Sequence, residues 1–329
     1  MKELNNNMKN ILVTGGRGFI GFNAIKLWKR LRPDLTIVNV DAETYADRFM
    51  IDEKNKWFEE HSIPSFVIDL GSDYALDLEA IESIVDTFSI DTICHFGAES
   101  HVDNSLNGPK IFFQSNIMGT VNLLEVARKK DIRFHMVSTD EVYGITYPTS
   151  NITVDSPMIP SSPYSSSKAS ADMIVQSYMK SFGLRATISR CSNNFGPWQM
   201  TEKLIPTILT KLERREKIPV YGDGKQCRQW IYVDDHNEAI LDLMEGDSGK
   251  IANISSNHLG YMKNLDIISF FAENIYGKKL NDVVEFVEDR KAHDTSYFIT
   301  HYRDLEYGSE HIYNMLQKTY EWYRDTCFK

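Results

Sequence analysis

The chain of 329 residues has few cysteines, and those it has are scattered. Cys94, Cys191, Cys227 and Cys327 form no Cys-x-x-Cys pair and show no spacing that is typical of metal ligands. Two of them, Cys94 and Cys191, fall in segments that we expect to be strands. We interpret them as buried thiols in a reducing cytosol, and we therefore expect a cytoplasmic protein that binds no metal.

The sequence also lacks an excess of basic residues, a long hydrophobic run and an N-terminal signal. It carries 36 Lys and Arg against 46 Asp and Glu, a net charge of −10, which argues against a nucleic-acid partner. No hydrophobic run approaches the roughly twenty residues that cross a bilayer, and the polar residues 1–10 lack the hydrophobic core of a signal peptide. With no repeat, low-complexity tract or flexible linker, we expect a globular protein of one large domain or two modest ones, without a membrane partner.

A glycine-rich turn follows the first predicted strand, residues 10–14. The segment GGRGFIG spaces Gly15, Gly18 and Gly21 three residues apart, and an amphipathic helix follows it and ends near Pro33. Between a strand and a helix, such a turn lets the backbone approach a pyrophosphate, whose charge the helix N-terminus stabilises. This position near the start of the chain predicts a dinucleotide site.

The second predicted strand, residues 35–40, ends at Asp41, twenty residues after Gly21. A carboxylate in that place accepts hydrogen bonds from the adenosine ribose and repels a 2′-phosphate. Arg17 argues in the other direction, because a cation in the glycine turn could meet that phosphate. We give more weight to Asp41, which occupies the discriminating position, and we expect NAD rather than NADP.

Strands and helices alternate through the rest of the first half. We expect strands at 65–68, 91–96 and 132–137, and helices over 45–63 and 78–88 and from Pro109 onward. This alternation predicts an α/β fold with a Rossmann-type, doubly wound parallel sheet. The later half resembles a smaller substrate-binding domain that packs on the first, and it ends in an amphipathic helix around residues 312–323.

Two adjacent carboxyl groups follow the strand at residues 132–137. Thr139, Asp140 and Glu141 would lie at the carboxyl edge of the sheet, where open α/β folds bind ligands. Two neighbouring carboxyls in different environments can hold opposite protonation states, so that one is an acid and the other a base. Without a preceding cofactor motif, a solvated acidic turn would be the simpler interpretation.

A tyrosine and a lysine stand on one face of the next predicted helix. Ser162 is a suitable N-cap, Pro163 suits the first helical position and Gly183 can end the helix. Tyr164 and Lys168 are four residues apart and share a face. About one phenol in a thousand is ionised at pH 7, a cost of roughly 4 kcal/mol that a nearby ammonium reduces. Tyr164 is therefore a candidate base for an alcohol proton, although an isolated pair of this kind is more often an exposed one.

The whole chain after residue 10 resembles the extended short-chain dehydrogenases/reductases. The segments that carry the resemblance occur in the same order, namely TGGRGFIG, HFGAESHVDNS, STDEVYG, SPYSSSKA, RCSNNFGPWQ, EKLIP, PVYGDG and VEDRKAHD. They are most similar to the nucleotide-sugar 4,6-dehydratases, both the dTDP-glucose 4,6-dehydratases and the UDP-glucose 4,6-dehydratase domain of rhamnose synthases. Thr-Asp-Glu before Val-Tyr-Gly is the most specific element, because epimerases and decarboxylases of the superfamily lack that acid pair.

The resemblance implies an internal redox cycle. Tyr164 would take the proton of the sugar 4-hydroxyl while hydride passes from C4 to NAD, with Thr139 bonded to that oxygen and Lys168 lowering the Tyr164 pKa. Glu141 would then remove the C5 proton and Asp140 would protonate the departing C6 hydroxyl, so that hydride returns to C6. Asp140 must be neutral while Glu141 is ionised, which adjacent like charges favour.

The resemblance also implies the binding residues and the assembly. Cofactor contacts carried over by motif are Gly15, Gly18, Phe19, Ile20, Gly21, Asp41, Ala42, Thr44, Asp69, Leu70, Phe96, Gly97, Ala98, Glu99, Ser115, Tyr164, Lys168 and Asn194. Substrate contacts are Ser100, Thr139, Asn193, Lys203, Leu204, Pro219, Tyr221, Arg228, Asn264, Arg290, His293 and Tyr297. Arg228 also suits a diphosphate clamp, because a guanidinium offers a planar fork of donors. We expect residues 1–190, with segments near 227–256, to bind NAD, residues 191–329 mainly to bind the nucleotide sugar, and a homodimer through the helices that begin near Pro109 and Pro163.

Several departures from the family pattern leave alternatives open. Arg17 replaces the usual alanine, and Lys291-Ala292 stands where bacterial dTDP-glucose enzymes have Pro-Gly. Asn104 in HVDNS is closer to the rhamnose synthases and favours UDP-glucose, but one thymine methyl is worth only about 1 kcal/mol, so both substrates are compatible. The alternatives are an NDP-sugar 4-epimerase or another extended short-chain dehydrogenase, a dehydratase for CDP-glucose or an amino sugar, and a non-catalytic NAD-sensing protein.

Overall fold

A computed structural model describes residues 8–44, 48–71, 75–256, 260–289, 294–301 and 309–328. Its centre is a seven-stranded sheet in the order β10-β6-β5-β4-β1-β2-β3, in which neighbouring strands pair in parallel. The strands are β1 (Asn10–Thr14), β2 (Thr36–Asp41), β3 (Ser65–Val67), β4 (Thr92–His95), β5 (Arg133–Thr139), β6 (Ala186–Cys191) and β10 (Ile251–Ile254). The predicted Rossmann-type sheet is confirmed, and the strand order reverses between β1 and β4.

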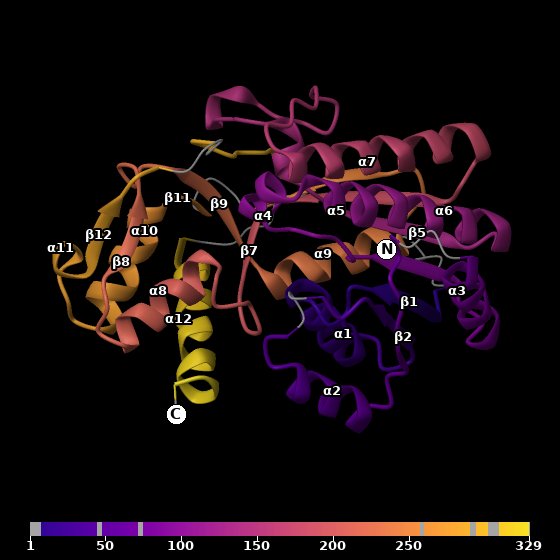
Figure 1. Ribbon diagram of the computed structural model, residues 1–329, viewed down its shortest axis with the longest axis horizontal. Coiled ribbons are helices and arrows are strands. Elements are labelled where there is room, and N and C mark those ends of the chain that lie inside the picture. Colours follow the sequence, from indigo (N-terminus) through magenta and orange to yellow (C-terminus); the bar gives the residue numbers. More distant parts are fainter. Residues whose placement is uncertain are drawn as a thin grey trace.

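Helices cover both faces of this sheet (Figure 1). On one face lie α3 (Ala75–Thr87), α6 (Gly119–Lys130) and α7 (Pro163–Phe182), and on the other lie α1 (Phe19–Leu31), α2 (Ile51–Glu60) and α9 (Val233–Glu245). Successive residues of β1 point to opposite faces of the sheet. Leu12 packs in the core under α3, α6 and α7, whereas Ile11 and Val13 pack in the core under α1, α2 and α9. Cys94 and Cys191 are buried in strands, as predicted.

Several segments after residue 193 build a second, smaller region at the left of Figure 1. It contains a three-stranded sheet of β7 (Asn193–Phe195), β9 (Cys227–Tyr232) and β11 (Tyr261–Lys263), and a two-stranded sheet of β8 (Ile218–Tyr221) and β12 (Val284–Val287). Its helical elements are α8 (Leu204–Glu213), α10 (Asn264–Ser269), η6 (Phe270–Ile275), α11 (Leu280–Val283) and α12 (Ser309–Thr326). Of the later half, α9 and β10 return to the large sheet, whereas β9 belongs to the small one.

The observed elements differ from the predicted ones where a helix is short or its geometry is irregular. The helix expected over residues 45–63 is limited to α2, and residues 45–47 lie outside the described part. The helix expected from Pro109 consists of α5 (Pro109–Phe113), the π-helical η2 (Gln114–Met118) and α6. The sequence analysis did not include α4 (Val102–Asn107), the 3-10 turns η3 (Asp140–Tyr143) and η4 (Pro148–Ser150), or the pairing of the small sheets.

The predicted caps of α7 are confirmed. Ser162 Oγ accepts a hydrogen bond from the Ser165 amide, Pro163 occupies the first turn, and Gly183 ends the helix with a φ of 65°. These caps fix where the helix begins, and therefore fix that Tyr164 lies in its first turn. Within the residues described, none of the helices combines the length and hydrophobicity that crossing a membrane would require.

Candidate active site

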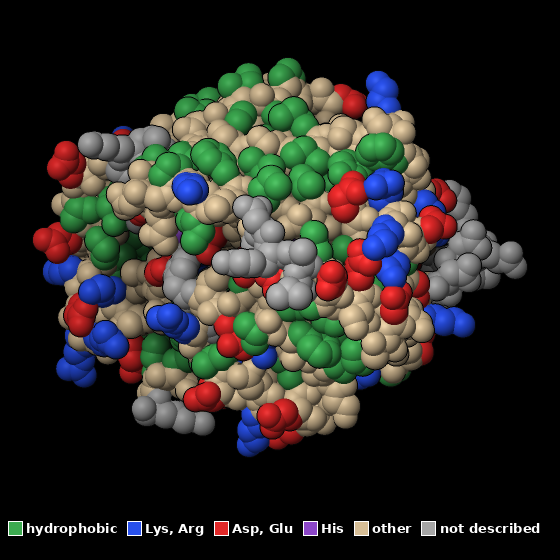
Figure 2. Space-filling model, turned by 45° about the vertical axis from the view of Figure 1, so that its right-hand side comes forward, with side chains coloured by type: hydrophobic (Ala, Val, Ile, Leu, Met, Phe, Trp, Pro, Cys, Tyr) green, Lys and Arg blue, Asp and Glu red, His purple; other side chains and the backbone are tan. Residues whose placement is uncertain are grey.

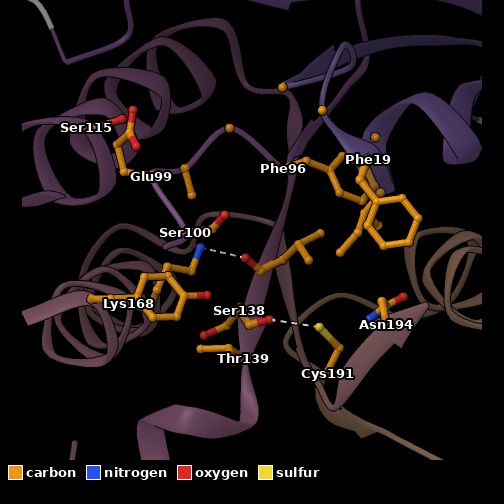
Figure 3. Close-up of a pocket in the computed structure, with 18 of the residues that line it drawn as sticks. Phe19, Phe96, Glu99, Ser100, Ser115, Ser138, Thr139, Lys168, Cys191 and Asn194 are labelled. Carbon is orange, nitrogen blue, oxygen red and sulfur yellow. Dashed lines mark hydrogen bonds between the residues drawn. The ribbon is translucent and has the colours of Figure 1, made fainter. Parts of the chain in front are cut away.

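A cavity of about 310 Å³ lies along the carboxyl ends of β1, β2, β4, β5 and β6, where the strand order reverses. Every residue that the sequence analysis assigned to the cofactor lines it, from Gly15 to Asn194. So do the five candidate catalytic residues, together with Ser100, Asn193 and Lys203 from the substrate set. Figure 3 shows how Phe19, Phe96, Glu99, Lys168 and Asn194 surround this space from separate segments of the chain.

The glycine turn forms the part of the wall where backbone segments approach most closely. Gly15 has a φ of +73°, and a Cβ on it would stand 2.6 Å from the amide nitrogen of Gly97, after β4. Gly21 meets a similar limit, because its Cβ would be 2.4 Å from the Gly15 carbonyl oxygen. The turn ends at Gly18, the N-cap of α1. This leaves exposed backbone and a helix N-terminus, the arrangement that binds a pyrophosphate.

Asp41 is held at the end of β2 by backbone donors. Its two carboxylate oxygens accept from the amides of Arg17, at 2.9 Å, and Glu43, at 3.1 Å. The Arg17 side chain is directed to α2 instead, where Nε donates to Asn55 Oδ1 at 3.0 Å, and it forms an ion pair with Glu43 at 3.2 Å. Arg17 does not line the cavity, whereas Asp41 does.

The acid pair lies in the 3-10 turn η3, directly after β5. Thr139 is the N-cap of this turn, and its Oγ1 accepts from the Glu141 amide at 3.3 Å and donates to Asp140 Oδ1 at 3.2 Å. Burial, and then the neighbouring Glu141, raises the pKa of Asp140 to about 8. Burial raises the pKa of Glu141 to about 7, against the positive charges of Arg228 and Lys203. Asp140 therefore keeps its proton at a pH where Glu141 is ionised.

Tyr164 and Lys168 project from the first two turns of α7 toward the same cavity. Lys168 Nζ donates to the Val137 carbonyl at 2.8 Å, which holds the ammonium at the wall of the cavity (Figure 3). Burial, followed by the charges of Glu141 and Cys191, raises the pKa of Tyr164 well above its usual value. Lys168 was expected to lower that pKa, but the shift in this structure is upward. Burial also lowers the pKa of Lys168 itself to about 8.

A buried ion pair joins the segments that carry these groups. Asp172, two turns after Tyr164, accepts two hydrogen bonds from the Arg190 guanidinium at 2.8 and 2.9 Å. Arg190 also donates to the Tyr143 hydroxyl at 2.6 Å, and Tyr143 donates to Asn253 Oδ1 at 2.8 Å. Arg190 and Asp172 are 1 % and 0 % exposed. The pair therefore links α7 to η3, β6 and β10, and nothing in the sequence spacing had indicated it.

Two predicted substrate residues, Arg228 and Tyr297, lie beside the acid pair without lining the cavity. The Arg228 guanidinium stacks 4.5 Å from the centre of the Tyr297 ring and donates to the carbonyls of Cys227 and Asp294, each at 2.8 Å. The Tyr297 hydroxyl donates to Asp294 Oδ2 at 2.5 Å. These contacts place a fixed positive charge and a phenol next to the carboxyl that is the candidate base.

The other predicted substrate residues are distributed more widely. Leu204 begins α8, Pro219 and Tyr221 lie on β8, and Asn264 begins α10, and none of these four lines the cavity. Arg290 and His293 lie outside the described residues.

The sequence analysis missed a second set of lining residues, namely Val40, Val137, Ser138, Cys191, Ser192, Gln199, Met200 and Glu202. Val40, Val137 and Cys191 stand at strand ends, where the rule that ligands bind at the carboxyl edge would have found them. Across the residues that can be described, no three His, Cys, Asp or Glu side chains are grouped to hold a metal ion.

Comparison with known proteins places the chain among nucleotide-sugar dehydratases. The family model for GDP-mannose 4,6-dehydratase matches residues 12–315. A dTDP-glucose 4,6-dehydratase of Mycobacterium tuberculosis is 38% identical over 323 residues, covering 96% of this chain and 93% of the relative. The low-salt glycan biosynthesis protein Agl12 of Haloferax volcanii is 41% identical over 298 residues, covering 88% and 89%. A dTDP-glucose 4,6-dehydratase of Bacillus anthracis, crystallised in complex with NAD, superposes with a TM-score of 0.84 at 35% identity over 97% of both chains.

Proposed function

The chain belongs to the GDP-mannose 4,6-dehydratase family and is an NAD-dependent nucleotide-sugar 4,6-dehydratase, and we propose that it converts dTDP-glucose, UDP-glucose or both to the 4-keto-6-deoxy sugar. The observation that carries this proposal is the convergence of a phenol, a neutral acid and an ionisable base on one cavity. Tyr164, Asp140 and Glu141 come from α7 and η3 and all line the same space.

The cavity fits a dinucleotide at the end opposite these groups. The backbone around Gly15 leaves no room for a Cβ, and the N-terminus of α1 follows at Gly18, so this region would hold the pyrophosphate. Asp41 would accept hydrogen bonds from the adenosine ribose. Bound NAD supplies the acceptor that takes hydride from C4 and returns it to C6.

The chain's own residues move the protons. Tyr164 removes the 4-hydroxyl proton, and the Thr139 hydroxyl, which donates to Asp140 and lines the same cavity, orients that oxygen. The resulting ketone acidifies the C5 proton, which Glu141 removes as its ionised carboxylate. Asp140, which keeps its proton to a higher pH, protonates the departing C6 hydroxyl.

We favour dTDP-glucose as the first substrate to test, because relatives that cover nearly the whole chain at 35–38% identity are named for it. The HVDNS segment, with Asn104, is the feature that favours UDP-glucose. A single thymine methyl contributes only about 1 kcal/mol of apolar burial, so one pocket can accept both bases.

We also propose that residues 1–190 with α9 and β10 bind NAD, that residues from 191 onward mainly bind the nucleotide sugar, and that two copies pair through the helices after Pro109 and Pro163. Exposed hydrophobic side chains support this pairing. They lie on α4, α5, η2 and α7 at Leu106, Ile111, Phe113, Met118, Met173 and Phe182. Figure 2 shows hydrophobic side chains gathered over the upper part of the molecule.

The decisive experiment incubates the protein and NAD with dTDP-, UDP- and CDP-glucose in parallel. We expect a product lighter by one water with no net formation of NADH, and the relative rates identify the base. A product of unchanged mass with inverted C4 would replace this proposal with a 4-epimerase, and no turnover of any sugar would point to an NAD-binding protein without this activity.

A further inference from the structure

Arg17 and Glu43 contact each other and also contact the same carboxyl group, that of Asp41. The Arg17 amide donates to one Asp41 oxygen at 2.9 Å, and the Glu43 amide donates to the other at 3.1 Å. The two side chains meet as well, because Arg17 Nη2 lies 3.2 Å from Glu43 Oε1. These three contacts form a closed ring that joins the glycine turn to the segment after β2. We call Arg17 and Glu43 the Asp41 clamp.

Helix α2 holds the Arg17 side of the Asp41 clamp from outside the cavity. Arg17 Nε donates to Asn55 Oδ1 at 3.0 Å, and the Lys54 ammonium donates to the Arg17 carbonyl at 2.7 Å. Arg17 is 6 % exposed, and Lys54 is fully buried. The guanidinium is therefore fixed against α2, and its charge is directed to Glu43 rather than into the cavity that Asp41 lines.

The Glu43 side of the Asp41 clamp has an unfavourable backbone conformation. Glu43 has a φ of 53°, in the left-handed region that residues other than glycine rarely adopt. Such a conformation persists where surrounding contacts hold it, and residues of this kind are concentrated at ligand sites. The Glu43 side chain is 38 % exposed, so packing contributes little to holding it. The ion pair with Arg17 and the amide bond to Asp41 are contacts that do hold it.

Building on the proposed function, in which Asp41 binds the adenosine ribose, we propose that Arg17 and Glu43 are positioning residues for that contact. Each Asp41 oxygen accepts one amide, and a carboxylate has about four lone-pair positions, so acceptor capacity remains for a ribose hydroxyl. The Asp41 clamp orients the carboxylate before the ligand arrives. Binding of NAD therefore does not have to order this group, which increases the affinity.

The Asp41 clamp also explains how a cation in the glycine turn is compatible with NAD. A free guanidinium there would bind a 2′-phosphate, whose oxygens match its fork of donors. The ion pair with Glu43 neutralises that charge and keeps the guanidinium on the α2 side of Asp41. A 2′-phosphate would then meet the charge of Asp41, which repels it. Arg17 therefore supports selectivity for NAD instead of opposing it.

The test compares three ligands by titration calorimetry with the full-length protein freed of NAD. They are NAD, an NAD analogue whose adenosine ribose lacks the 2′-hydroxyl, and NADP. We expect the wild-type protein to bind NAD more tightly than either of the others. Arg17→Ala and Glu43→Ala should each weaken NAD binding roughly fivefold or more, the scale of one hydrogen bond. They should weaken binding of the analogue much less, because it has no 2′-hydroxyl for Asp41 to accept.

A double variant and a control separate positioning from general damage. Because the two residues act on one contact, Arg17→Ala combined with Glu43→Ala should lose no more NAD affinity than the larger single loss. The control is Lys56→Ala, which removes a cation of α2 that is 75 % exposed and lies 3.8 Å from Glu60. It should keep the wild-type affinity for all three ligands. Since Glu43 is partly exposed, Glu43→Ala tests the Asp41 clamp even where Arg17→Ala folds poorly.

Four results would overturn the Asp41 clamp. They are an unchanged NAD affinity in Glu43→Ala, an equal loss of affinity for NAD and the analogue, and fully additive losses in the double variant. The fourth is a larger loss of affinity for NADP than for NAD in Arg17→Ala, which would assign Arg17 to a phosphate. Failure of the proposed ribose contact gives a different result, because the wild-type protein would then bind NAD and the analogue equally, and Asp41→Ala would not weaken NAD binding.

Discussion

The two ends of the cavity differ in the atoms that form their walls. Around Gly15 and Gly97 the wall is backbone, so close that a single Cβ would stand 2.6 Å from an amide nitrogen. Around Asp140, Glu141 and Tyr164 it consists of buried ionisable side chains whose pKa values are all raised. The first end serves binding, which needs space and fixed donors. The second serves chemistry, which needs an acid and a base with pKa values near neutral pH, as Asp140 and Glu141 have.

We expect the largest effect from a substitution that disables only the catalytic end of the cavity. Tyr164→Phe removes the base for the 4-hydroxyl, and we expect kcat to fall by roughly 10²- to 10⁴-fold. Affinity for NAD should change far less, because the backbone end of the cavity is untouched. Stopped-flow absorbance of transient NADH and titration calorimetry measure the two quantities.

The matched control for this variant is Tyr178→Phe, on the same helix. Its hydroxyl donates to Glu125 Oε1 at 2.6 Å, away from the cavity. It should retain normal turnover. An equal loss in both variants would mean that α7 had been disturbed as a whole, and that Tyr164 has no separate role.

We expect an intermediate effect from a substitution that disturbs only the end of the cavity that binds NAD. Gly15→Ala adds a Cβ at a φ of +73°, against the backbone of Gly97, at a cost of about 1–3 kcal/mol, so NAD affinity should fall by roughly tenfold or more. Gly183→Ala has the same left-handed conformation, with a φ of +65° and no atom within 4 Å of its Cβ. It should lower stability but leave NAD affinity unchanged. Equal affinity for NAD in the two variants would contradict the role of the close backbone packing around Gly15 in binding NAD.

We expect the smallest effect from a change of pH, which should alter catalysis but not NAD affinity. The active form has Glu141 ionised and Asp140 protonated, so kcat/KM should be greatest between about pH 7 and 8. It should fall below pH 7 as Glu141 gains a proton, and above pH 8 as Asp140 loses one, with apparent values that belong to the pair. NAD affinity should not follow this profile. Asp140→Asn should weaken the alkaline limb to the part that Lys168, with a pKa of about 8, contributes, and an unchanged profile would remove Asp140 from the acid's role.

The raised pKa values of Asp140 and Glu141 also determine how the stability of the protein depends on pH. A carboxyl whose pKa in the folded protein is raised above its unfolded value binds a proton more readily when folded. Asp140 and Glu141 therefore contribute more to stability as pH falls from about 8 toward their unfolded pKa values, and less as pH rises.

The cofactor end could be predicted from the sequence because its signals are local. Gly15, Gly18 and Gly21 lie between one strand and one helix, and Asp41 ends the next strand, so spacing alone locates them. Pro219, Tyr221 and Asn264 were assigned by resemblance only, and they lie on elements of the small region that do not reach the cavity.

Two features of the chemical end depend on three-dimensional packing. The upward shift of the Tyr164 pKa follows from burial, whose extent no spacing of Tyr and Lys reports. The pairing of Asp172 with Arg190 joins a helix to a strand 18 residues away, and either residue alone has the pattern of an ordinary surface charge. Local patterns therefore identified the reacting groups, but not the environment that adjusts them.

The Asp172–Arg190 pair also has a consequence for motion. Separating a fully buried pair leaves an uncompensated charge in the interior, a cost of about 3–5 kcal/mol. Detaching helix α7 from the sheet therefore requires more than a small local fluctuation, and the amides of its buried turns around Asp172 should exchange with solvent slowly. The helix that carries Tyr164 and Lys168 is thus anchored by a contact outside the cavity, which holds these two side chains in place whether or not a ligand is bound.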